Sequence, residues 1–139
     1  MTLNIIIADD NPGDQYLLRQ SILDLNPMHR ISSVYHGAQL LELLLKKGQY
    51  ANISDGLPDC IFLDLRMPVL DGFESLMELK ANDILKEIPV FILSSYILTN
   101  EKINQICLKA AGFYYKTSDY DKLKINVAAI LKKMQVQMQ

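Results

Sequence analysis

The chain has 139 residues, of which 50% are hydrophobic and 22% are charged, and its formal net charge is −2. This composition is typical of a single globular domain with a sizeable core and excludes an intrinsically disordered chain. The small net charge and the lack of a lysine or arginine cluster argue against a nucleic acid as partner.

Strand-like and helix-like segments alternate along the chain. Short runs of apolar residues predict five β-strands, at residues 3–8, 30–35, 60–63, 90–93 and 112–115. Between and after them, apolar residues recur at helical spacing and predict five helices. The predicted buried faces are Leu17, Leu18, Ile22 and Leu25; Leu40, Leu41, Leu43, Leu44 and Leu45; Phe73, Leu76, Met77 and Leu79; Ile103, Ile106, Cys107 and Ala110; and Leu123, Val127, Ile130, Leu131 and Met134.

Helix boundaries follow from capping and turn residues. Asn11 is a suitable cap for the first helix, and Pro12 suits its first turn. We expect the second helix to stop near Gly48, the fourth just before Gly112, and the fifth to be capped by residue 118 or 119. The polar segment 48–58 predicts a surface loop.

Five successive βα units predict the fold class. Such a series implies a parallel sheet with right-handed crossovers and helices on both faces, which is an α/β domain. We see no linker or repeat, and therefore predict one domain over residues 1–139. His29 and His36 flank the second strand, at the periphery of the sheet, and we interpret both as surface residues.

The cellular compartment is inferred from cysteines and from apolar segments. Cys60 and Cys107 fit no metal or redox spacing, so we interpret them as reduced packing residues. Asp9 and Asp10 interrupt the first apolar run, and no signal peptide is visible. No apolar stretch approaches the ~18 residues of a membrane span. We predict a cytoplasmic protein without a membrane partner.

Polar side chains close four of the predicted strands. Asp9 and Asp10 follow the first run, Asp64 the third, Ser94 the fourth and Lys116 the fifth. Taken singly, each has a simpler interpretation as a turn, cap or loop residue. Ligands of open α/β sheets bind at the carboxyl edge of the strands, and Mg²⁺ needs few carboxylates because it keeps several waters. Together these residues predict a cation site with a charge partner.

This set of residues, in this order and spacing, resembles the receiver domains of two-component response regulators. The resemblance covers essentially the whole chain and includes Met67, Pro68, Asp71, Gly72 and Pro89. The segment 10–14 and the long loop before the third strand further resemble the small stand-alone receivers associated with bacterial phytochromes. The resemblance implies a flavodoxin-like, doubly wound sheet with strand order 2-1-3-4-5 and no output domain.

The resemblance also implies the chemistry of the site. Asp64 would be the phosphoacceptor, attacking the phosphohistidine of a sensor histidine kinase or phosphotransfer protein to form an acyl phosphate. Mg²⁺ would be held by Asp9, Asp10, Asp64 and the backbone carbonyl of Arg66. The protein would not be an enzyme, although it would promote its own phosphorylation and dephosphorylation.

Further implied roles concern the switch. Ser94 and Lys116 would each bond a phosphoryl oxygen, and Phe113 would turn inward as Ser94 moves. The face formed by the fourth helix, fifth strand and fifth helix would then bind a downstream protein or a second copy of the chain. The added charge of the phosphoryl group would bias this two-state element.

Three positions depart from the family pattern. Thr117 follows Lys116 where the family usually has a proline after a cis bond; a non-proline cis bond costs ~2.5–4 kcal/mol, so we predict a trans bond and a rearranged loop. Arg66 and Tyr96, which lie two positions after Asp64 and Ser94, are bulky. They either shield the acyl phosphate from water or simply lie in solvent.

Three alternatives remain at this stage. A degenerate receiver would bind partners without phosphorylation. A Mg²⁺-dependent phosphohydrolase would use Asp64 as nucleophile, but such enzymes usually have a second acid where Arg66 stands. A flavodoxin-like mononucleotide binder would need a phosphate loop after the first strand, where Asp9 and Asp10 would repel a phosphate.

Overall fold

Strands and helices alternate throughout the computed structural model, which describes residues 2–53 and 56–137. The predicted strands are confirmed to within one residue at either end. In chain order the elements are β1 (Asn4–Ala8), α1 (Pro12–Leu25), β2 (Arg30–Val34), α2 (Gly37–Leu45), the 3₁₀ turn η1 (Gly48–Tyr50), β3 (Cys60–Asp64), α3 (Gly72–Ala81), β4 (Val90–Ser94), α4 (Asn100–Cys107), β5 (Gly112–Tyr115) and α5 (Tyr120–Gln137).

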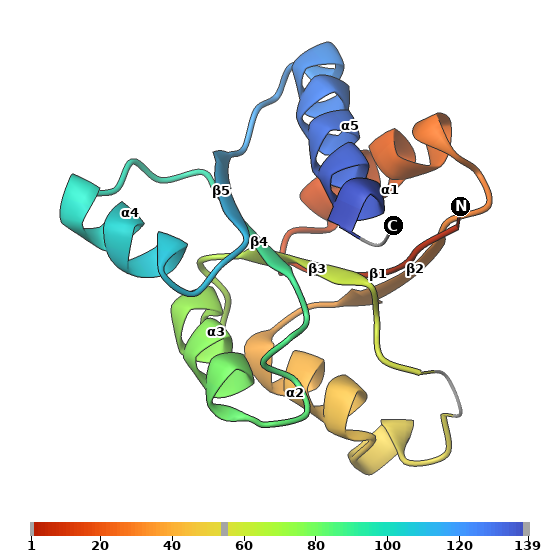
Figure 1. The fold of residues 1–139 in the computed structure, drawn as a ribbon, viewed down its shortest axis with the longest axis vertical. Helices are drawn as coiled ribbons and strands as arrows, with labels where there is room; N and C mark the ends of the chain where they lie inside the picture. The colour runs from red at the N-terminus through yellow and green to blue at the C-terminus, as the bar shows by residue number, and fades with distance from the viewer. Residues whose placement is uncertain (1, 54–55, 138–139) are drawn as a thin grey trace.

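The strands form one parallel sheet in the order β2-β1-β3-β4-β5, which confirms the predicted doubly wound topology. Helices α1 and α5 cover one face, and α2 and α3 cover the other (Figure 1). Alternate residues of β3 and β4 point into the two resulting cores, so both strands are buried along their whole length. This burial on both faces explains why these strands are continuous apolar runs.

Helix caps are formed by the residues that the sequence indicated. The Asn11 side chain accepts a hydrogen bond from the Asp14 N–H at 3.0 Å. For α5, the Asp119 carboxylate accepts bonds from the N–H groups of Asp121 and Lys122. A capping box between Asp71 and Glu74 begins α3. These caps set where the loops at the carboxyl edge of the sheet turn into helices.

Helix α4 differs from its predicted form. It ends at Cys107, so Ala110 lies beyond it, and Gly112 is the first residue of β5. The helix lies beside the edge strand β5, and it buries Ile106 while Cys107 is exposed. The prediction that both cysteines pack in the core is therefore wrong for Cys107. It is correct for Cys60, whose thiol has a pKa raised to about 12 by burial.

The two histidines are not the surface residues that the sequence suggested. His29 is 6% exposed, and its Nδ1 accepts a hydrogen bond from the Leu3 N–H at 2.9 Å. His36 is half-buried and caps α2, accepting from the Gln39 N–H at 3.0 Å. The prediction fails because the turn after α1 packs His29 against the start of β1, a contact between distant parts of the sequence.

The described part of the chain contains no helix that is both long and apolar enough to cross a membrane.

His29 predicts a specific pH dependence of stability. Burial lowers its pKa, so the unfolded chain takes up the proton more readily than the folded one. The stabilising contribution is present above the ordinary histidine pKa and is lost as the pH falls through the folded value. His29→Gln keeps a hydrogen-bond acceptor but cannot titrate. Urea unfolding should show a shallower loss of stability between about pH 7.5 and about pH 5.5 than in the wild type; an equal loss in both proteins would contradict this assignment.

Candidate functional site

Three carboxylates meet at the carboxyl edge of the sheet. Asp9 and Asp10 follow β1, and Asp64 is the last residue of β3. One oxygen from each of these three side chains lies within 4.8 Å of the other two. Asp9 and Asp64 are buried, whereas Asp10 is exposed and opens the cluster to solvent. The predicted acidic cluster is thus assembled by adjacent strands.

Lys116 joins the cluster from the end of β5. Its Nζ lies 2.7 Å from Asp9 Oδ2, 2.8 Å from Asp14 Oδ2 and 3.3 Å from Asp64 Oδ1. Its backbone N–H donates to the Ser94 carbonyl at 2.7 Å, which continues the pairing of β5 with β4. The lysine therefore bridges segments that are far apart in the sequence.

Two residues of the site were missed by sequence reasoning. Asp14 lies in the first turn of α1, where acids are common for reasons of helix stability alone, so its ion pair with Lys116 had no distinct signal. Gln15 is buried, and its Nε2 donates to the carbonyls of Ile7, Asp9 and Val34. It ties α1 to the ends of β1 and β2 and so fixes the backbone that carries the acidic pair.

The electrostatics of the site are unusual because one lysine faces two buried acids, Asp9 and Asp64, and the partly exposed Asp14. Burial, with the neighbouring Asp9 charge, raises the pKa of Asp64 to about 7 against the attraction of Lys116. Burial likewise raises the pKa of Asp9, although bonds from Lys116 and from the Asn11 N–H oppose it. Burial alone would lower the pKa of Lys116, but its bonds to Asp14 and Asp9 hold it above the usual value. Shifts of this kind are typical of functional sites.

The donor set fits a hard divalent cation. Carboxylate oxygens are the ligands that Mg²⁺ and Mn²⁺ prefer, and the three acids offer them from one open-sided cluster. A cation would also offset the burial and the Asp9 charge that together raise the pKa of Asp64. The further ligand that we predicted, the backbone carbonyl of Arg66, stays a prediction.

Ser94 lies at the end of β4, as predicted, but its hydroxyl is hydrogen-bonded to the Tyr96 backbone. The side chain is buried, and its hydroxyl donates to the Tyr96 carbonyl and accepts from the Tyr96 N–H, both at 3.1 Å. The neighbouring Ser95 lines the hollow above Asp64 instead. A bond from Ser94 to a phosphoryl group would require its hydroxyl to leave Tyr96.

Arg66 and Tyr96 meet over the rim of that hollow. The Arg66 guanidinium carbon lies 3.9 Å from the centroid of the Tyr96 ring, and both residues line the hollow together with Asp10, Asp64 and Lys116. Both side chains are exposed, yet they are stacked on one another and do not extend separately into solvent. This contact joins the loop after β3 to the loop after β4.

Two further predictions concern β5: the position of Phe113 and the peptide bond between Lys116 and Thr117. Phe113 is half-buried against the core beneath α2 and α3 and makes an edge-to-face contact with Tyr115 at 5.1 Å between centroids. The described residues contain no cis peptide bond, so the predicted trans bond between Lys116 and Thr117 is confirmed. The switching role of Phe113 stays a prediction.

The loop between β3 and α3 is folded tightly against the Asp64 backbone. A Cβ atom on Gly72 would lie 2.1 Å from the Asp64 carbonyl oxygen, so this position requires a glycine. Val69 has a φ of 69°, a left-handed conformation that is unfavourable for a β-branched residue. Strain of this kind is often stored at functional sites.

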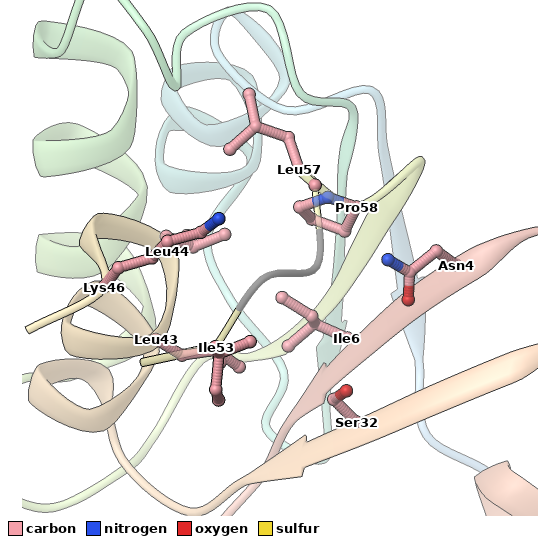
Figure 2. A pocket seen from close by; sticks show the side chains of 10 residues that line it. Asn4, Ile6, Ser32, Leu43, Leu44, Lys46, Ile53, Leu57 and Pro58 are labelled. Carbon is pink, nitrogen blue, oxygen red and sulfur yellow. The ribbon is translucent and has the colours of Figure 1, made fainter. Parts of the chain in front are cut away.

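A second hollow lies at the opposite, amino edge of the sheet, between α2 and the starts of β1 and β3 (Figure 2). Its volume is about 70 Å³, and its wall includes Ile6, Leu43, Leu44 and Ile53. Among its described lining residues there is no carboxylate, and the polar ones do not form an ion cluster. The titratable groups therefore single out the carboxyl edge as the functional site.

Comparison with known proteins supports this assignment. The family model of the response regulator receiver domain matches residues 5–128. Response regulator Rcp1 from Synechocystis sp. is 32% identical over 91 residues, which are 66% of this chain and 60% of Rcp1. The chain covers less of the next two curated relatives, 33% and 26% of their lengths.

Two solved structures are similar over almost the whole chain. The phosphorylated cyanobacterial phytochrome response regulator RcpA has 31% identity and a TM-score of 0.82, with 94% of this chain and 91% of that chain covered. The Mn²⁺-bound form of Rcp1 has 28% identity and a TM-score of 0.80, with 92% and 91% covered. With the carboxylate cluster and its lysine at the carboxyl edge of a 2-1-3-4-5 sheet, these matches show that the chain belongs to the response regulator receiver domain family.

Proposed function

We propose that this chain is a phosphorylation-switched signalling protein in which Asp64 accepts a phosphoryl group from a sensor histidine kinase or phosphotransfer protein. The observation that carries the proposal is the position of Asp64, buried at the end of β3 between the acidic pair and Lys116. The phosphoryl group accumulates on the protein, which is therefore a phosphoacceptor and not an enzyme that turns over a substrate.

The residues around Asp64 divide the chemistry between them. Asp9, Asp10, Asp64 and the Arg66 backbone carbonyl would hold Mg²⁺, which supplies charge neutralisation for phosphoryl transfer when bound. Lys116, already 3.3 Å from Asp64, would pair with a phosphoryl oxygen. The similarity to a Mn²⁺-bound and to a phosphorylated receiver supports both assignments.

The output is proposed to be a change in partner binding. Ser94 would bond the phosphoryl group, Phe113 would turn inward, and the face formed by α4, β5 and α5 would change shape. Exposed apolar side chains on or directly next to these elements, among them Tyr115, Ile125 and, just after α4, Leu108, support a protein partner, whether a downstream protein or a second copy. We place this activity in the cytoplasm and expect no role for nucleic acid or membrane.

The phosphohydrolase alternative is less well supported. It would need an acid two residues after Asp64, where Arg66 instead stacks on Tyr96. The degenerate receiver is disfavoured because Asp64, the acidic pair and Lys116 are within ion-pair or metal-binding distance of one another.

Phosphorylation is tested with acetyl phosphate and Mg²⁺, followed by intact-mass measurement. Wild-type protein should gain the mass of one phosphoryl group and lose this gain when EDTA is present. Asp64→Asn should gain none, whereas Asp83→Asn, which changes an exposed acid outside the site, should behave as wild type. Turnover of the donor without accumulation would support a hydrolase, and no modification would support the degenerate receiver.

The raised pKa of Asp64 predicts a pH-dependent gain of stability in Asp64→Asn without metal. Because the folded-state pKa is about 7 and the usual value is 3.8, the folded protein binds more protons between these values. The favourable contribution of this carboxyl at low pH is lost as the pH rises through about 7. In EDTA, Asp64→Asn should therefore exceed the wild type in unfolding free energy by more at about pH 8 than at about pH 5. An advantage that is equal at both pH values would contradict the assignment.

The stacked pair predicts the lifetime of the phosphorylated form. Arg66→Ala or Tyr96→Ala should admit water to the hollow above Asp64 and shorten the lifetime about two- to five-fold, the equivalent of one exposed cation–π contact. Decay is followed by intact mass after the donor is removed. Tyr96→Phe keeps the ring and should retain the wild-type lifetime; unchanged lifetimes in both alanine variants would refute the shielding.

A further inference from the structure

The Ser94 hydroxyl forms two hydrogen bonds with the backbone of Tyr96, a residue that lines the hollow above Asp64. It donates to the Tyr96 carbonyl and accepts from the Tyr96 N–H, both at 3.1 Å. A hydroxyl has a single proton, so Ser94 cannot donate to a phosphoryl oxygen while it donates to this carbonyl. Whether Ser94 can donate to a phosphoryl oxygen therefore depends on the position of the Tyr96 backbone.

Tyr96 is held from the other side by Arg66. The guanidinium stacks 3.9 Å from the ring centroid, and Arg66 belongs to the loop that starts directly after Asp64. The stack and the two hydrogen bonds thus form one chain of contacts, from the loop after β3, through the Tyr96 side chain and backbone, to the Ser94 hydroxyl. Tyr96 is 46% exposed and Arg66 is exposed as well, so their stack lies outside the core and its loss should leave the fold intact.

We propose that Tyr96 and Arg66 are positioning residues that act through Ser94. Their stack holds the Tyr96 backbone where it retains the Ser94 hydroxyl, and so opposes the bond from Ser94 to a phosphoryl group on Asp64. The inference rests on the proposed function, since it presupposes a phosphoryl group at Asp64. The coupling between the stack and the Ser94–phosphoryl bond is reciprocal. The stack weakens this bond by a certain factor, and the bond weakens the stack by the same factor.

Binding of beryllofluoride in the presence of Mg²⁺, measured by titration calorimetry, tests the inference. Tyr96→Ala should bind this phosphoryl analogue about two- to five-fold more tightly than the wild type, because the retaining stack is gone. Its affinity for Mg²⁺ alone should not change, since the lost side chain is uncharged and supplies no carboxylate. Tyr96→Phe should restore the wild-type affinity. Lys124→Ala, which removes a cation–π contact on α5 instead, should also match the wild type.

A double-mutant cycle shows whether the effect passes through Ser94. In a Ser94→Ala background, Tyr96→Ala should give no gain in beryllofluoride affinity, and Arg66→Ala combined with Tyr96→Ala should gain no more than Tyr96→Ala alone. An unchanged or weaker affinity in Tyr96→Ala, or an equal gain without Ser94, would overturn the inference while leaving the proposed function standing. A wild type that binds no beryllofluoride would instead overturn the proposed function, and the inference with it.

Discussion

The sharing of one lysine among three carboxylates is the interaction on which the site depends. The Lys116 ammonium contacts Asp9, Asp14 and Asp64, which come from the end of β1, the start of α1 and the end of β3. These contacts, together with Lys116 at the end of β5, link four elements of the fold. Burial, with the neighbouring Asp9 charge, still raises the pKa of Asp64, and this uncompensated acid makes a divalent cation favourable at this edge.

The rest of the molecule serves to keep these side chains in place. The central strands β1, β3 and β4 are buried on both faces, so their ends cannot move independently of the two cores. Gln15 fastens α1 to β1 and β2, and Gly72 lets α3 begin in contact with the Asp64 backbone. The rigid sheet thus presents its charged groups on short loops, an arrangement that suits a switch driven by one added phosphoryl group.

The contacts that the proposed switch would change lie in the loops after β3 and β4. Arg66 and Tyr96 are exposed and contact each other, while Ser94 is buried and bonded to Tyr96. In the proposed switch, a change at Asp64 would be passed on through these few contacts, which lie largely outside the two cores. The proposed shielding of the phosphoryl group and the proposed switching through Ser94 would therefore depend on the same two loops.

Strand positions and the residues at their ends were predictable, because an apolar run closed by a charge is a local pattern. Caps such as Asn11 and Asp119 were predictable for the same reason. The amino-acid sequence by itself determined the parallel sheet, the acidic pair, Asp64, Ser94 and Lys116. Only the tertiary structure decided that His29 is buried, that Asp14 pairs with Lys116, and that Arg66 stacks on Tyr96. Each of these contacts joins residues distant in the chain, and no local periodicity encodes which distant loops a fold brings within a few ångströms.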